Sequence, residues 1–375
     1  MTAAQEIRAQ ALEVAAGWSP PDAPGSWRLT AGLFRAIAAH DKLLDALAVL
    51  PPDRLPALLA SAAIRWIVQR EKPAPLAGYF PEPGRPQPGF DDRFFPAADA
   101  FFSARHPDII AACRGRRYQM NEVARCTQVA LGLAATAAPD QPVALVDLGT
   151  GAGLGLHLDR YRYQVGTLAF GPMAAALSLR CDLRGTRVPE AAGLPPIAGR
   201  AGIELRPVDL HDPQARAWLQ ACAPPEASAL ARLAAAVEVA RRHPAPIVAG
   251  DAVTALPGVL AGFPPGQPVV VVDAYLAVFL SAEQRAELMA IMAGAARTRP
   301  VTWLSLDPLV PLGPTGNRSV QGLDLPAALV RDYQEQGVFA LLGSRTFHSR
   351  RDQGRLLARA HPSGQWVEWI DATRP

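Results

Sequence analysis

Three glycines, Gly149, Gly151 and Gly153, follow the apolar run Val143–Leu148, which is typical of a buried strand. Closely spaced glycines let a backbone approach a ligand, because they carry no Cβ atom. No lysine follows them, so the turn is not a phosphate-binding P-loop. The third glycine also stands one position too early for the dinucleotide fingerprint G-x-G-x-x-G. The turn therefore either binds another kind of ligand or is a tight turn that binds none.

The order of residues favours the first alternative. Asp147 followed by G-x-G-x-G resembles the first motif of class I S-adenosylmethionine (SAM) methyltransferases. SAM presents an amino acid and a ribose instead of a pyrophosphate, so glycines serve mainly to let the backbone come close. The resemblance implies SAM as the cofactor, with Asp147 helping to hold the methionine ammonium, often through water.

An acid is expected to hold the ribose at the end of the next parallel strand. Glu204 lies at the end of the strand-like run Gly202–Leu205, and Asp209 follows five residues later. Asp209 and Asp212 suit the capping of a helix that starts near Pro213, because short acids accept hydrogen bonds from helix N–H groups. We therefore prefer Glu204 for the ribose and keep Asp209 as the alternative.

The third predicted strand, Pro246–Val248, leads to Asp251 and Ala252. Their place resembles the methyltransferase position where an Asp meets the adenine amino group. Asp251 is equally well suited to cap the next helix.

The fourth predicted strand, Pro268–Val272, is followed by Asp273 and Tyr275. An acid after four valines is expected at the carboxyl edge of a parallel sheet, where ligands bind. Asp273 is our candidate for a general base or an orienter of the substrate nucleophile, with a helix cap as the alternative. We count Tyr275 with Asp273 as a candidate catalytic residue, and Tyr275 and Phe279 are expected to line the site or to pack in the core.

Asn121 and Arg125 stand before and within the last helix of the N-terminal half. Asn121 is a good N-cap residue, and we count it with the cofactor-binding residues. Arg125, one turn further, is expected to reach the SAM carboxylate; the alternative is a surface arginine.

The elements around these residues predict an α/β fold. Residues 1–135 have helical spacing and form a predicted helical domain, for which we expect a substrate or lid role. Residues 136–375 alternate strands with helices, which predicts a doubly wound, mainly parallel sheet of the class I methyltransferase type. Two strand-like runs around His-Pro-Ser-Gly predict an antiparallel C-terminal hairpin. Residues 161–197 interrupt this alternation of strands and helices, and we interpret them as an inserted β-hairpin.

Composition narrows the class of protein. Half of the 375 residues are hydrophobic, 19% are charged and the formal net charge is +3, so neither nucleic acid nor membrane is the expected partner. The four cysteines form no C-x-x-C pair, and the histidines show no zinc spacing, so no metal is expected. The N-terminus lacks the apolar run of a signal peptide, which favours a cytoplasmic protein.

Six segments of the chain resemble the sequences of a poorly characterised bacterial family. This family is classified as a domain of unknown function and is regarded as methyltransferase-like. The six segments are YQMNEVARC, VDLGTGAGLGLHLDRYRY, AGIELRPVDLHDP, VAGDAVTALP, WLSLDP and RLLARAHPSGQWVEWI. The family implies the fold and a SAM site but supplies no substrate. Its members often have F-H-S-W where this chain has VVDAY, so a histidine is missing at the edge of the fourth strand.

The leading hypothesis is a SAM-dependent methyltransferase that acts on a small molecule, for example in specialised metabolism. Methyl transfer is an in-line displacement in which positioning supplies most of the rate, so the sequence need not show a strong acid or base. The alternatives are another displacement or cyclisation on the same fold, and a non-catalytic binding or scaffold partner of another enzyme. Besides a small-molecule substrate, the partners to consider are another protein and a second copy of this chain.

Overall fold

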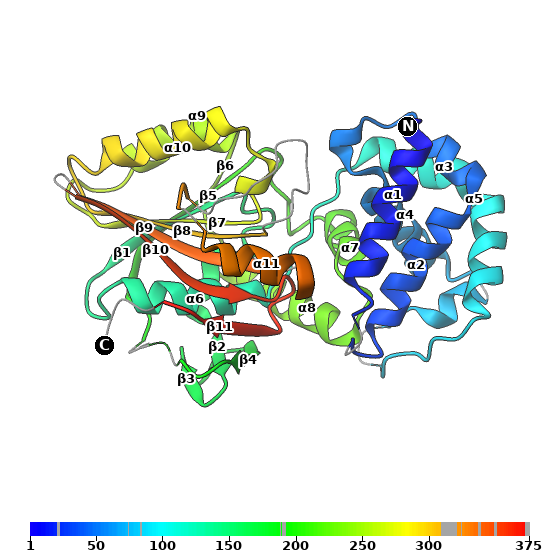
Figure 1. The fold of residues 1–375 in the computed structure, drawn as a ribbon, viewed down its shortest axis with the longest axis horizontal. Coiled ribbons are helices and arrows are strands. Elements are labelled where there is room, and N and C mark those ends of the chain that lie inside the picture. Colours follow the sequence, from blue (N-terminus) through cyan, green and yellow to red (C-terminus); the bar gives the residue numbers. More distant parts are fainter. Residues whose placement is uncertain are drawn as a thin grey trace. The chain divides into compact units, whose positions relative to one another are not determined.

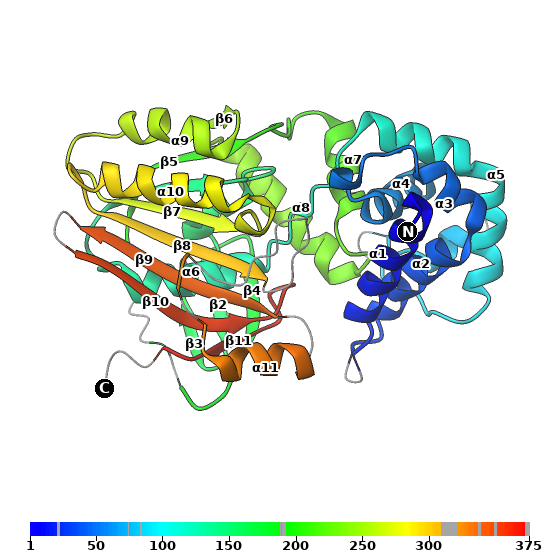
Figure 2. The same cartoon turned by 45° about the horizontal axis from the view of Figure 1, so that its top comes forward.

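The computed structural model describes residues 1–20, 23–73, 75–82, 85–187, 189, 193–308, 321–323, 325–336, 339–348 and 351–371. The chain divides into two compact units, whose elements are labelled in Figures 1 and 2. The helical unit consists of Met1–Asn121 and Asp209–Ala234, and the sheet unit of Glu122–Val208 and Ala235–Pro375. The division falls at residue 121 instead of 135 and adds a later segment to the helical unit.

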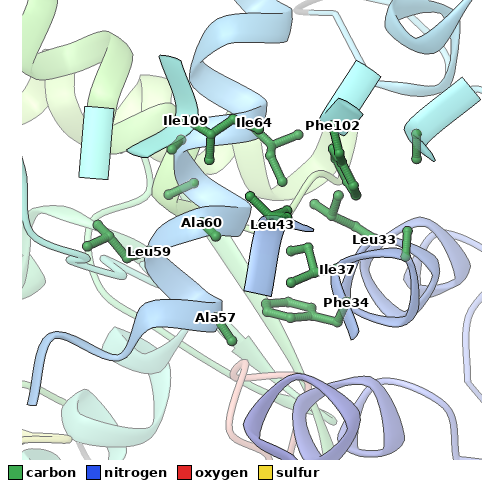
Figure 3. Close-up of a cluster of buried hydrophobic side chains, with 14 of the residues drawn as sticks. Leu33, Phe34, Ile37, Leu43, Ala57, Leu59, Ala60, Ile64, Phe102 and Ile109 are labelled. Carbon is green, nitrogen blue, oxygen red and sulfur yellow. The ribbon is translucent and has the colours of Figure 1, made fainter. Parts of the chain in front are cut away.

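The helical unit is built around apolar helix faces. Its elements are α1 (Ala3–Gly17), α2 (Trp27–Ala39), α3 (Asp41–Leu47), η1 (Pro52–Arg54), α4 (Pro56–Glu71), η2 (Leu76–Tyr79), α5 (Phe94–Gly115) and α7 (Pro213–Cys222). Leu33 and Ile37 of α2 meet Ile64 of α4 and Phe102 of α5 in the core (Figure 3). The predicted cap at Asp212 is confirmed, because its carboxylate accepts the N–H groups of Gln214 and Ala215.

The sheet unit contains one eleven-stranded sheet in the order β3-β2-β4-β11-β10-β9-β8-β7-β1-β5-β6. Five neighbouring strands are parallel: β1 (Val143–Leu148), β5 (Ile197–Glu204), β6 (Ile247–Ala249), β7 (Val269–Ala274) and β8 (Val301–Pro308). The next three, β9 (Ala340–His348), β10 (Arg351–Ala360) and β11 (Trp366–Trp369), follow as an antiparallel meander. The predicted parallel sheet and its antiparallel C-terminal hairpin, β10–β11, are confirmed.

Helices cover both faces of this sheet. The helices α9 (Ala252–Ala261) and α10 (Ala282–Ala295) pack on one face, where Leu256 and Met292 share a core with Val271 and Trp303. The helix α6 (Arg125–Thr136) covers the other face, against β8 and β9 (Figures 1 and 2). The remaining helices are η3 (Leu154–Arg160), η4 (Ala277–Phe279), α11 (Ala327–Gln336) and α8 (Ala227–Arg242), which crosses from one unit to the other. The α/β fold is therefore doubly wound, as predicted.

The strand order defines where a ligand would bind. From β1 the chain runs outward through β5 to β6, and it then returns to form β7 and β8 on the other side of β1. The switch point lies between β1 and β7, where Leu148 pairs with Asp273. Open α/β sheets bind ligands outside the carboxyl ends of the strands at such a point.

The segment between β1 and β5 extends the sheet. A hairpin, β2 (Arg162–Val165) with β3 (Leu168–Phe170), is followed by β4 (Ser178–Arg184), which runs parallel to β2. β11 pairs with β4, so this segment continues the sheet beyond the C-terminal hairpin. In the part of the chain that the structure describes, no helix has the length and apolarity to cross a membrane.

Candidate functional site

The glycine turn ends β1 in a conformation that favours glycine. Gly149, Gly151 and Gly153 have φ angles of 64°, 59° and 73°, which lie in the left-handed region. A Cβ atom on Gly149 would lie 3.2 Å from Leu276 Cδ1, and one on Gly153 would lie 2.9 Å from Ile247 Cδ1. The turn therefore lies at the ends of neighbouring strands, as the sequence predicted.

The turn continues into the short 3₁₀ helix η3 and then into β2, without an α-helix. A pyrophosphate would need the aligned N–H groups and the dipole of an α-helix start. This local structure argues against a dinucleotide, in agreement with the spacing of the glycines.

Asp147 lies beneath the turn and is buried. The Thr150 hydroxyl donates a hydrogen bond of 2.6 Å to its Oδ2. Burial raises the pKa of Asp147, the hydrogen bond from Thr150 lowers it and the charge of Glu204 raises it, and the net pKa is about 7. Asp147 is therefore poised to change its charge when a cation binds beside it.

Glu204, the last residue of β5, is tied to the glycine turn. Its Oε2 accepts the N–H of Gly151 at 2.9 Å, and its Oε1 accepts the N–H of Arg206 at 3.2 Å. Asp209 instead accepts the N–H of His211 at 2.8 Å, in the turn before α7. Leu205, directly after Glu204, is 65% exposed and offers an apolar surface beside the acid.

Asp251 caps α9, which was one of its two expected roles. Its Oδ1 accepts the N–H groups of Val253 and Thr254 at 3.0 and 3.1 Å. The Thr254 hydroxyl lies 3.3 Å from the same atom. Among the described residues, Oδ2 has no hydrogen-bond partner and remains available to a ligand. Ala252 is buried as the first residue of α9.

Asp273 ends β7 inside the protein, with 1% of its surface exposed. The Trp303 indole N–H donates to its Oδ2 at 2.6 Å, and the Ser305 hydroxyl lies 3.1 Å from Oδ1. The same hydroxyl lies 2.8 Å from Asp307 Oδ2. Burial, and then the neighbouring Asp307, raise the pKa of Asp273 well above its usual value. A general base must be ionised, so this environment favours a positioning role for Asp273.

Tyr275 has an unusual backbone, with a φ angle of 66°. A bulky residue rarely adopts this conformation, and such strain is concentrated at functional sites. The Arg125 guanidinium stacks on its ring, with 3.6 Å between Cζ and the ring centroid. Burial raises the pKa of the Tyr275 phenol, so the hydroxyl is protonated at neutral pH.

The prediction that Asn121 caps the helix is wrong. The helix α6 begins at Arg125, Ala124 occupies its N-cap position, and Glu122 accepts the N–H of Ala124 at 3.1 Å. Asn121 Nδ2 donates to the carbonyl of Gln119 at 3.3 Å. The helix starts late because the preceding residues form turns, which helical spacing does not reveal.

The C-terminal turn holds Arg125 in place, which the sequence did not indicate. Arg125 Nε donates to the carbonyl of Pro362 at 2.7 Å. Gln128 Nε2 donates to the carbonyls of His361 and Trp366 at 3.0 and 3.1 Å. The two segments carrying N-E-V-A-R-C and H-P-S-G-Q-W are more than 230 residues apart in sequence and meet here. Their distinctive residues therefore position the start of α6.

Replacing Gly364 by alanine should destabilise this contact. Gly364 has a φ angle of 73°, and a Cβ atom on it would lie 2.5 Å from the Ala124 carbonyl carbon. Because backbone must move to relieve that clash, we expect a loss of about 1–3 kcal/mol in the free energy of unfolding. Denaturant titration measures this loss, and Gly266→Ala is the control. Gly266 has a similar φ of 76°, but no atom lies within 4 Å of the position that its Cβ atom would take. Equal stabilities of the two variants would contradict the contact.

Within the described ranges, no group of three or more His, Cys, Asp or Glu side chains is arranged to hold a metal ion. The candidate site is a set of carboxylates, one arginine and one tyrosine near a glycine turn, at the edge of the sheet where doubly wound α/β proteins generally bind ligands. The chain belongs to the family described as an uncharacterised protein conserved in bacteria (DUF2332), whose model matches residues 7–369.

No curated protein matches the chain. One similar solved structure is that of the 23S rRNA methyltransferase ErmE. It has 14% sequence identity and a TM-score of 0.22, over 56% of this chain and 73% of that chain.

Proposed function

We propose that the protein binds SAM at the carboxyl edge of β1, β5 and β6 and transfers its methyl group to a small molecule. The observation that carries the proposal is the glycine turn. Three left-handed glycines stand at the switch point, and the Glu204 carboxylate bonds directly to the N–H of Gly151. This arrangement brings bare backbone and a hydrogen-bond acceptor together where open α/β sheets bind ligands.

The residues at this edge fit the parts of SAM. Glu204 accepts backbone N–H groups on both of its oxygens, and each oxygen of a carboxylate can accept more than one bond, so Glu204 can receive the ribose hydroxyls. Asp251 Oδ2 suits an amino group such as that of adenine, and the exposed Leu205 offers an apolar surface to a flat base. Asp147 suits the ammonium of the methionine part.

SAM supplies an activated methyl group on a sulfonium. The chain's own contribution is to hold the acceptor in line with that group and to exclude water, because positioning can lower such a barrier by about 7–11 kcal/mol. Asp273 orients the end of β7 through its bonds with Trp303 and Ser305. No described residue has to remove a proton when the acceptor is already ionised.

Titration calorimetry with S-adenosylhomocysteine, 5′-methylthioadenosine and NAD tests the cofactor. We expect the two adenosyl thioethers to bind and NAD not to bind. Binding of NAD alone would contradict the proposal. Mass spectrometry of candidate substrates incubated with SAM then tests the reaction through the gain of one methyl mass.

Replacing Glu204 by glutamine should weaken binding of S-adenosylhomocysteine by about 1–3 kcal/mol. The amide presents one acceptor oxygen where the carboxylate presents two, so the ribose hydroxyls and the N–H of Gly151 compete for it. Asp209→Asn is the matched control, because among the described residues the Asp209 carboxylate bonds only within its own turn. If Asp209→Asn weakens binding and Glu204→Gln does not, the ribose is held by the alternative acid.

A further inference from the structure

Arg125 of α6 and Tyr275, next to the end of β7, each have a buried polar group without a hydrogen-bond partner among the residues that the structure describes. Arg125 is 7% exposed, and its Nη2 has no hydrogen-bond partner among the described residues. The Tyr275 hydroxyl is buried and is likewise without a partner there. A buried group of this kind costs about 1–3 kcal/mol when it stays unpaired, and more when it is charged. Both groups belong to the same stacked pair.

Several independent contacts hold Arg125 and Tyr275 in this arrangement. Arg125 is fixed at three points: its Nε bonds to Pro362, its guanidinium lies on the Tyr275 ring, and it starts α6. Tyr275 keeps a left-handed backbone while its N–H donates to the carbonyl of Leu306 at 2.9 Å. Strain that is held by surrounding bonds is typical of sites that await a ligand.

The chemistry of the pair selects the ligand. Arg125 forms no ion pair with any described acid, so its charge is not neutralised by a salt bridge within the described part of the chain. The raised phenol pKa makes Tyr275 a hydrogen-bond donor at neutral pH. A planar cation and a hydroxyl donor suit the two oxygens of a carboxylate, and a single positive charge matches its single negative charge.

We propose that Arg125 Nη2 and the Tyr275 hydroxyl together bind a carboxylate, either that of an acidic small-molecule substrate or that of the methionine part of SAM. The placement of this ligand rests on the proposed function. In either case Arg125 and Tyr275 act as one subsite, and the experiment distinguishes the two sources.

The test uses two matched pairs of probes. Benzoate and benzamide differ in their charge, and S-adenosylhomocysteine differs from 5′-methylthioadenosine by its amino acid end. Calorimetry is carried out on the wild type and on Arg125→Leu, Tyr275→Phe and Arg180→Leu. Arg180→Leu removes the same charge from an exposed position of β4 and is the control.

We expect each of the first two variants to weaken carboxylate binding about tenfold or more, and Arg180→Leu to leave it unchanged. If the carboxylate belongs to SAM, the variants weaken S-adenosylhomocysteine and spare 5′-methylthioadenosine. If it belongs to a substrate, they weaken benzoate and spare both adenosyl compounds. Unchanged binding of every carboxylate probe in both variants overturns the subsite. A wild type that prefers benzoate to benzamide but binds neither adenosyl compound refutes the proposed cofactor and leaves the subsite standing.

Thermal unfolding provides the second measurement. Tyr275→Phe removes only a hydroxyl that has no partner in the described part of the chain, so its melting temperature should equal or exceed that of the wild type. A clear decrease would show that the hydroxyl has a partner within the fold, and it would overturn the proposal even if Arg125→Leu fails to fold.

Discussion

Replacing Gly151 by valine should weaken binding of S-adenosylhomocysteine by more than about 100-fold. Gly151 has a φ angle of 59°, which costs a residue with a Cβ atom roughly 1–2 kcal/mol and a β-branched residue more. The turn must therefore change its backbone, and the N–H of Gly151 then leaves Glu204 Oε2. In this variant the backbone of the turn can no longer come close to the ligand, and Glu204 is no longer held in position for the ribose. The loss of affinity should therefore exceed that of Glu204→Gln.

Gly266→Val is the matched control for this prediction. Gly266 also has a positive φ, of 76°, and it precedes β7, at the opposite end of that strand from the site. Both variants should lose comparable stability, as measured by denaturant titration, and only Gly151→Val should lose the ligand. A folded Gly151→Val protein with wild-type affinity would remove the glycine turn from the SAM site.

The sequence predicts the parallel part of the sheet because each strand carries its own signal. A run such as Val269–Val272 is apolar on both faces, as a strand covered on both sides must be. The glycine turn is predictable for a similar reason: its three left-handed residues are local requirements of the backbone. The position of Glu204 beside the turn can be predicted from the strands and the turn together, because Glu204 ends the strand that neighbours β1.

What the sequence could not supply are contacts between distant segments. The Asn121 prediction failed because N-cap preference depends on where the helix begins, and α6 begins four residues later. The bond from Arg125 to Pro362 joins residues 237 positions apart, and neither residue alone indicates the other. Gly364 was the available signal, because a Cβ atom at this left-handed position would lie 2.5 Å from the Ala124 carbonyl carbon, so the close approach requires glycine.

The surroundings of Asp273 could not be predicted from the sequence either. An acid after four valines indicates the carboxyl edge, but its function depends on the next strand, where Ser305 pairs with Asp273. Trp303 and Ser305 on that strand both bond to its carboxyl group, and Asp307 raises its pKa. A residue that looks like a general base in sequence is thus buried in the fold beside a second carboxyl group, and these two effects on its pKa outweigh the opposing hydrogen bonds from Trp303 and Ser305.

Asp147 gives the protein a titrating group at the site whose effect on stability has a definite sign. Its pKa is about 7 in the folded protein against an ordinary value of 3.8. Between these two pH values the folded state binds more protons than the unfolded state. The contribution of Asp147 to the free energy of unfolding is therefore fully present below about pH 4 and is lost as the pH rises towards 7. Asp147→Asn should flatten this decline, which amounts to roughly 4 kcal/mol.

The same group should make cofactor binding depend on pH in the opposite direction. If Asp147 holds the methionine ammonium, the ligand selects the ionised carboxylate, and binding releases a proton. With a pKa of about 7, the ionised fraction rises about tenfold between pH 6 and pH 8, and the affinity for S-adenosylhomocysteine should rise equally. 5′-Methylthioadenosine lacks the ammonium and should show no such rise, and Asp147→Asn should abolish the rise for S-adenosylhomocysteine. Calorimetry in buffers of different ionisation enthalpy measures the released proton directly. A flat affinity profile for S-adenosylhomocysteine, alongside the expected fall in stability, would show that Asp147 titrates in the fold but does not contact the ammonium.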